Sequence, residues 1–200
     1  MNIKPLLPIL AAAVFTLTAC SSGPQAPPPQ YYQLRLQAPE TTPAAPSAPS
    51  GDVWQLVAPV KLPEYLERDV LWLPVGASGM QPLPNHRWAE PLDEAVPRIL
   101  LHDLAQLHGA DRVVSGTLPA GLKVARQLRL QILDFSVAAD RSAVHIVARC
   151  TVSVPSGGQP LRVVDLDVSA AAAGSEPDAL VAAHRLALWR LAQQLSQRLN

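Results

Sequence analysis

The sequence predicts an α+β protein: a single two-layer domain with a mainly antiparallel sheet and two main helices packed on one face. Three segments between residues 128 and 170 alternate apolar and polar residues, which is typical of strands with one face in water. Two other segments, at about 91–108 and 175–199, place leucines at helical spacing. Because the three strands are joined by short links, they are expected to form a meander that the helices cover.

Residues 1–19 have the pattern of a lipoprotein signal peptide. Lys4 precedes an apolar stretch, and small residues stand before Cys20, as a signal peptidase requires. The stretch is too short for a transmembrane helix, which needs roughly 20 apolar residues. The ending LTAC resembles the bacterial lipobox, so we expect Cys20 to become the mature N-terminus. It would carry diacylglycerol and an N-acyl chain, and no other cofactor is expected.

Acylation of Cys20 predicts a protein that is anchored to a membrane without crossing it. Several acyl chains on one residue hold effectively permanently, whereas a single chain holds only marginally. Ser21 stands where sorted lipoproteins that stay at the inner membrane have aspartate. By this resemblance we expect the lipid anchor to lie in the outer membrane, with the domain on the periplasmic face.

A tether and one domain follow the anchor. Residues 20–30 form the tether, because after Cys20 they include four prolines and no hydrophobic residue larger than alanine. The domain is expected over residues 31–200, with a disordered Pro/Ala/Ser-rich insert at 38–52. Residues 31–36 alternate as a strand does. The sequence leaves open whether this strand pairs into the domain across the insert, since the entropic cost of a long loop rises slowly with its length.

Charge and cysteine content exclude several classes of protein. Without residues 1–19 the chain keeps 15 Lys plus Arg, having lost Lys4, against 16 Asp plus Glu, so its net charge is about −1. No basic patch of the kind that binds nucleic acid is visible. Cys150 is the only cysteine besides Cys20, so no intramolecular disulfide is expected once Cys20 is acylated.

The first part of the domain predicts two strands on either side of an unusual turn. Residues 53–58 alternate as a strand, residues 61–69 form the turn, and residues 70–75 are expected to be a buried strand. A Gly- and Pro-rich link follows, over about 76–85.

A helix is predicted next, over about residues 91–108. Pro97 is compatible only with a first turn, which allows the regular helix to begin two to four residues after Pro91. Asp103 lies in the centre of the apolar stripe, where a carboxylate must be paired. We interpret it as a satisfied structural acceptor near the sheet edge rather than a ligand contact. A short strand is expected at 111–116.

The three long strands of the meander follow. Two of them, at 144–154 and 164–170, alternate strictly. In the first, over 128–137, the apolar face shifts by one residue after Ile132, which indicates a β-bulge. We expect its buried face to consist of Leu128, Leu130 and Ile132 and then Leu133, Phe135 and Val137.

The last helix is expected from Ser175 to about Leu199. A stripe of leucines and alanine can cover the dry face of the sheet. On a helical wheel Trp189 falls opposite this stripe, with Arg185 and Gln193 beside it, which makes Trp189 a candidate for partner contact. The alternative is that a loop or the strand at 31–36 covers it.

The sequence contains no pattern typical of an enzyme. It has no Gly-rich phosphate loop and no GxSxG elbow, and its five histidines lack metal-ligand spacing. We therefore expect no catalytic residues, no metal site and no enzymatic activity. His184, on the apolar side of the last helix, is interpreted as a core histidine.

Two motifs resemble those of the PqiC-type lipoproteins, the auxiliary lipoproteins of ABC-type transport systems. They are APVKLPEYLERDVLWL at 58–73 and HRWAEPL at 86–92. Together with Trp189, the motif or partner-contact candidates are Pro63, Tyr65, Leu66, Arg68, Trp88, Glu90 and Pro91. The alternative for several of them is that they only brace the fold, with Arg68 and Glu90 as possible ion-pair partners.

The resemblance implies a non-enzymatic role at the outer-membrane end of an ABC or MCE-type system that moves lipids between membranes and supports envelope integrity. The implied partner is a periplasm-spanning MCE-domain protein. A homo-oligomeric ring is implied only by analogy with the ring-shaped MCE tube. The alternative is a structural or assembly lipoprotein that scaffolds outer-membrane or cell-wall machinery.

Overall fold

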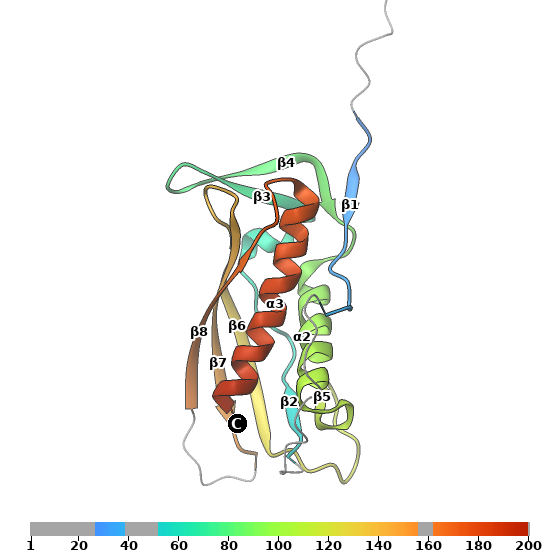
Figure 1. The fold of residues 1–200 in the computed structure, drawn as a ribbon. Coiled ribbons are helices and arrows are strands. Elements are labelled where there is room, and N and C mark those ends of the chain that lie inside the picture. Colours follow the sequence, from blue (N-terminus) through green and yellow to red (C-terminus); the bar gives the residue numbers. More distant parts are fainter. Residues whose placement is uncertain (1–26, 39–51, 156–161, 200) are drawn as a thin grey trace, which may run out of the picture.

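The computed structural model describes residues 27–38, 52–155 and 162–199, and Figure 1 shows their fold. Within these residues the α+β class is confirmed, with two α-helices, two short 3-10 helices and two sheets. The predicted signal peptide, the acylation site Cys20 and most of the predicted insert lie outside the described residues.

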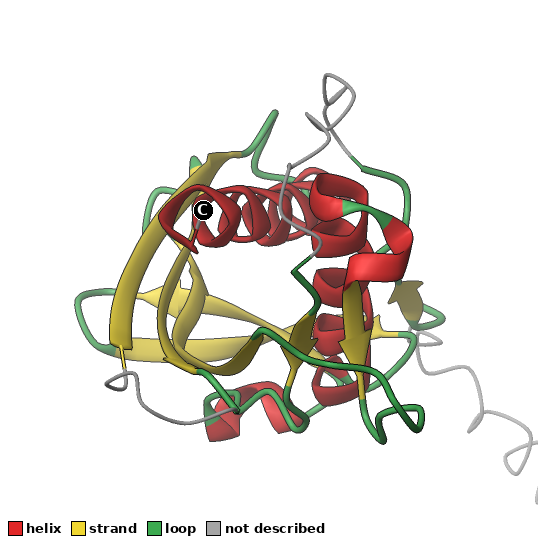
Figure 2. Cartoon of the chain, turned by 90° about the horizontal axis from the view of Figure 1, so that it is seen from below, coloured by secondary structure: helices red, strands yellow, loops and turns green. Residues whose placement is uncertain are grey.

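The larger sheet has five strands and contains the predicted meander. Three long strands pair antiparallel in sequence order, and a short strand, β2 (Trp54–Leu56), lies parallel between the first of them and β5 (Val113–Ser115). Figure 2 shows how strongly this sheet curves around the helices. The order across the sheet is β5 (Val113–Ser115), β2 (Trp54–Leu56), β6 (Arg126–Val137), β7 (Ala143–Ser153) and β8 (Arg162–Ala171).

The predicted bulge is present in β6, but it changes which residues are buried. The register with β7 shifts between Ile132 and Asp134. Leu133 is the extra residue and is 44% exposed, whereas Phe135 is buried. The expectation that Leu133 continues the apolar face was therefore wrong, because a bulge leaves one residue out of the alternation before it resumes.

A second, three-stranded sheet lies at one end of the molecule (Figure 1). Its order is β1 (Gln30–Tyr32), β4 (Gly79–Trp88) and β3 (Val70–Val75), with β1 parallel and β3 antiparallel to β4. The open question about the N-terminal strand is thus answered, since β1 does pair into the domain. β3 was expected to be fully buried, but only Leu71 and Leu73 are, because alternate residues of a strand face opposite sides of the sheet and the other side is only partly covered.

β4 corrects the expectation of an irregular link over 76–85. Prolines at 82 and 84 argued against a strand, because proline cannot donate a ladder hydrogen bond. β1 pairs only with His86–Trp88, so both prolines lie where no strand of the described residues pairs with β4 on that side. The sequence carries no local signal for this pairing.

Both helices lie on one side of the large sheet, as predicted. α3 (Pro177–Leu199) packs on β7 and β8, and α2 (Leu92–His108) packs on α3 and β5. α2 begins at Leu92, directly after its N-cap Pro91, so Pro97 lies inside the helix rather than in a first turn. In the described part of the chain, no helix is long and apolar enough to cross a membrane.

Candidate functional site

The first motif forms a short 3-10 helix, η1 (Glu64–Glu67), which follows Pro63. The Pro63 carbonyl accepts a hydrogen bond from the Leu66 amide at 3.0 Å. The hydroxyl of Tyr65 donates to Asp134 Oδ1 at 3.2 Å and accepts from the Phe135 amide at 3.1 Å. Burial raises the pKa of Tyr65 to about 12, so the phenol stays protonated and can donate. Tyr65 thereby holds the motif turn on the bulge of β6.

The second motif closes the base of the β3–β4 hairpin. The Trp88 amide donates to the Asp69 carbonyl at 2.6 Å, and Arg87 Nη1 lies 2.9 Å from both carboxylate oxygens of Asp69. The proposed ion pair of Arg68 with Glu90 is not formed, because Glu90 pairs with Arg98 of α2 at 2.5 Å. Arg68 is exposed and its backbone is extended. Successive side chains of an extended chain point in opposite directions, so the side chain of Arg68 points away from that of Asp69.

Trp88 is part of the core. It is 5% exposed, and its ring meets His184 edge-on with centroids 5.5 Å apart. The Phe135 ring also packs against this histidine, with centroids 4.9 Å apart. His184 Nδ1 is hydrogen-bonded to the Leu180 carbonyl at 2.7 Å, and burial lowers the pKa of His184 to about 4. A neutral histidine thus packs as an aromatic ring where the two sheets meet.

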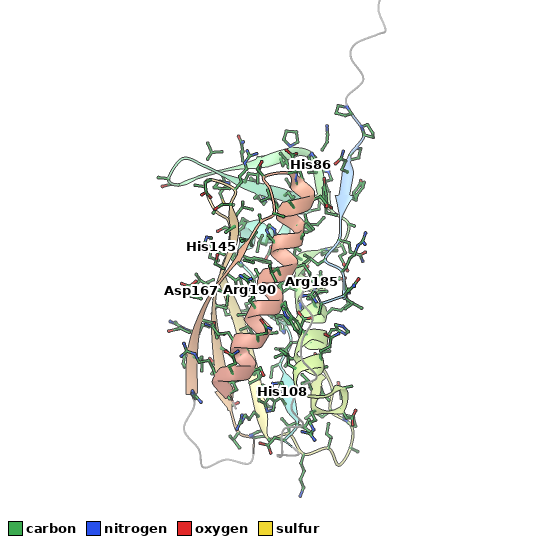
Figure 3. The ribbon with its side chains drawn as sticks, in the orientation of Figure 1. His86, His108, His145, Asp167, Arg185 and Arg190 are labelled. Carbon is green, nitrogen blue, oxygen red and sulfur yellow. The ribbon has the colours of Figure 1, made fainter. Side chains whose placement is uncertain are left out.

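A buried ion pair joins the two helices. Arg185 of α3 contacts both carboxylate oxygens of Asp103 on α2, at 2.6 and 2.8 Å. The same guanidinium donates to the carbonyls of Arg35 and Leu36, at 2.7 and 3.1 Å. Burial raises the pKa of Asp103, and the charged bonds with Arg185 oppose that rise. Arg185 therefore clamps the segment after β1 onto the junction of the helices (Figure 3).

The expected outward face of α3 is a second buried face. Trp189 is 0% exposed and Arg185 only 6%. The two residues lie one turn apart, and Arg185 reaches α2 and the segment after β1. Trp189 is thus not available as a contact in this domain. The helical wheel failed because it identifies one apolar stripe, whereas α3 packs on both the sheet and α2.

The structure brings most of the motif residues together as braces of the fold. Leu66 and Trp88 are buried, and Tyr65 packs against the core. Pro91 caps α2, with its carbonyl accepting from the Ala95 amide at 3.0 Å. Among the eight candidates, Arg68 and Pro91 keep exposed surfaces.

Sequence reasoning missed the role of Arg185. The signal was present, because a carboxylate on the apolar stripe of one helix requires a cation, and Arg185 is a candidate on the other helix.

A cleft of about 680 Å³ lies beside the ion pair of Arg185 with Asp103. Its walls combine Arg35 and Asp178 with the edge of α3 and both tyrosines of β1. The described residues hold no group of three or more His, Cys, Asp or Glu side chains placed to bind a metal ion.

The fold and these contacts define a class: an α+β domain in which an N-terminal strand is clamped back onto two helices and a motif turn is fixed on a bulged meander. The chain belongs to the family of ABC-type transport auxiliary lipoprotein components, whose model matches residues 32–196. The resemblance of the two motifs to PqiC-type lipoproteins is thereby confirmed.

Two solved structures share this fold. One, described as an uncharacterized protein, is 19% identical with a TM-score of 0.67, covering 87% of this chain and all of that one. The other, a Xanthomonas campestris protein of family DUF330, is 16% identical with a TM-score of 0.65, covering 84% of this chain and 92% of that one. Comparison with curated proteins gives no match.

Proposed function

We propose that this protein is an outer-membrane lipoprotein, acylated on Cys20, which serves as a non-enzymatic auxiliary component of an ABC/MCE-type intermembrane lipid transport system. Membership in the family of transport auxiliary lipoproteins carries the proposal. The lipobox-like ending before Cys20 and Ser21 directly after it support an anchor in the outer membrane. On this view the chain's work is docking and placement, in support of envelope integrity.

The way the chain enters the domain supports an orientation relative to the membrane. β1 lies in the small sheet at one end of the molecule, and β5 and the C-terminal end of α3 lie towards the other end (Figure 1). A chain anchored at Cys20 would present the small sheet to the outer membrane. The opposite end would then face the periplasm and a periplasm-spanning MCE-domain partner, and several copies could sit around such a tube as a ring.

Purification from membranes tests the proposal. The full chain should carry fatty-acid label, fractionate with the outer membrane, and co-purify with an MCE-domain protein or an ABC permease. The Cys20→Ser variant should lose both the label and the membrane fraction. An unlabelled, soluble full chain would overturn the anchor. A labelled chain that co-purifies only with cell-wall or assembly proteins would overturn the transport role and favour a scaffold.

A further inference from the structure

We propose that the β3–β4 hairpin is a membrane-contact element, whose uncharged tip inserts among the lipid headgroups of the bilayer that holds the chain. The inference rests on acylation of Cys20, which belongs to the proposed function. It assigns a second contact with the same membrane to a surface made of protein side chains.

The hairpin is unusual in combining exposure with a lack of charge. No Asp, Glu, Lys or Arg occurs from Val70 to Asn85, although charged residues make up 16% of the chain. All residues from Val75 to Pro82 are exposed. Val75 and Met80 are 46% and 40% exposed, and they are two of the six large apolar residues that are exposed in the described part of the chain. Exposed apolar groups rimmed by polar residues are typical of an interaction surface.

The turn keeps this tip narrow. Gly76 has φ +62°, a conformation that side chains disfavour, and a Cβ at Gly79 would lie 2.7 Å from the Val75 carbonyl oxygen. Val75 pairs with Gly79 across the hairpin. Two small residues therefore close the end, and the apolar side chains just behind it are not shielded by the turn.

Two charged residues at the base of the hairpin are paired with each other. Asp69 and Arg87 form a salt bridge at 2.9 Å where β3 begins and β4 nears its end. Beside Arg87 on β1 lies Tyr31, which is 62% exposed. Tyrosine is favoured at the headgroup level of membranes, where one end of the ring is apolar and the other is wet.

The position of the anchor selects the bilayer as the occupant. β1 leads the chain out of the domain at the end where the hairpin projects (Figure 1). Residues 20–30 can span at most about 40 Å, so the hairpin stays within reach of the lipid surface. Because the anchor already holds the chain at the bilayer, the contact of the hairpin with the lipid is a second binding event between linked partners. The effective concentration for such an event is roughly millimolar with a short flexible linker. Two apolar side chains and a tyrosine can then bind the surface although they would not hold a free protein.

A fluorescence experiment on the acylated full chain tests the inference. An environment-sensitive probe is placed on Ser78→Cys at the tip, and on Thr117→Cys, an exposed uncharged position near β5, as the matched control. Cys150 will not compete for the label, because it is buried and burial raises its pKa to about 12. The acylated protein is bound to vesicles of phosphatidylethanolamine and phosphatidylglycerol and is then exposed to iodide.

The expected result is a blue-shifted probe at position 78 that iodide quenches about threefold less than the probe at position 117, as for a group at the headgroup level. Val75→Ser combined with Met80→Ser should abolish this difference while the protein stays on the vesicles. Equal quenching at the two positions in vesicle-bound protein would overturn the hairpin contact and leave the anchor intact. A chain that carries no lipid and does not bind vesicles would overturn the anchor, and the hairpin contact with it. Protection at position 78 without vesicles would assign the hairpin to a protein contact instead.

Discussion

Arg185 joins three parts of the fold that lie far apart in the sequence. It links Asp103 on α2, its own helix α3 and the carbonyls of Arg35 and Leu36. Its side chain is 7% exposed and that of Asp103 is 0% exposed. A buried pair contributes little net stability when intact, but removing one partner leaves an uncompensated charge.

We predict that Arg185→Met lowers the free energy of unfolding by about 3–5 kcal/mol, because the Asp103 carboxylate then stays buried without a cation. Adding Asp103→Leu should recover part of this loss. Urea denaturation of the chain from Ser21 onward measures both effects. Arg149→Met is the control, since its pair with Asp165 is exposed and should be worth little. Equal losses for the two arginine variants would contradict the prediction.

His184 gives the fold a dependence on pH. Burial lowers its pKa to about 4 in the folded state, from 6.5. Between these values the unfolded chain binds a proton that the folded chain does not, so stability falls as the pH falls from 6.5 towards 4. The loss due to this residue is expected to reach roughly 3 kcal/mol. When the free energy of unfolding is measured by urea denaturation at several pH values, the His184→Phe variant should lose less stability between pH 6.5 and pH 4 than the unchanged protein. Equal losses in the two proteins would show that His184 is not the cause.

At the scale of elements, the bulge in β6 and the motif turn support each other. At the bulge, the Tyr65 hydroxyl donates to Asp134 and accepts from the Phe135 amide. β8 is the edge strand of the large sheet, and side chains of α3 bind its backbone. Arg190 donates to the Ser169 carbonyl at 2.7 Å, and Gln194 donates to the Asp167 carbonyl at 3.4 Å. Such coverage protects an edge strand from pairing with another chain.

We predict that Tyr65→Phe costs about 1–3 kcal/mol, because the half-buried Phe135 amide and Asp134 lose a partner while the ring still packs. Amide hydrogen exchange should accelerate at Phe135 and in η1 before it does in β7. Tyr31→Phe serves as the control, since the Tyr31 side chain is largely exposed. No change in exchange at the bulge would show that the hydroxyl does not hold the turn there.

At the scale of the whole molecule, residues 30–38 belong to the domain. Tyr32 stacks on His86 and is hydrogen-bonded to its Nδ1 at 2.9 Å. Leu34 is 1% exposed, and the next two residues supply the carbonyls that Arg185 binds. β1 and the residues that follow it are therefore part of the folded domain.

A chain that begins at Asp52 should unfold with a free energy lower by about 2–5 kcal/mol, because the site of Leu34 becomes a cavity and Arg185 loses two acceptors. Adding the peptide of residues 27–38 should raise the melting temperature, since it can rejoin β4 as a strand. The same peptide with Leu34→Asp is the matched control. If neither peptide binds, the segment does not contribute to the fold in this way.

The sequence by itself determined the α+β class, the meander, the two helices and the position of the bulge. Each of these rests on a period of two or of 3.6 residues, which is a local property of the chain. It also determined that Asp103 needs a partner, because burial of an unpaired carboxylate is costly wherever it occurs.

Only the tertiary structure decided which surfaces remain free. The pairing of β1 with β4, the prolines inside β4 and the burial of Trp189 depend on segments far apart in the chain, so no local pattern announces them. The helical wheel of α3 shows one apolar stripe and cannot show that α2 and residues 35 and 36 cover a second face. Periodicity records which residues prefer to be buried, whereas long-range packing decides what buries them.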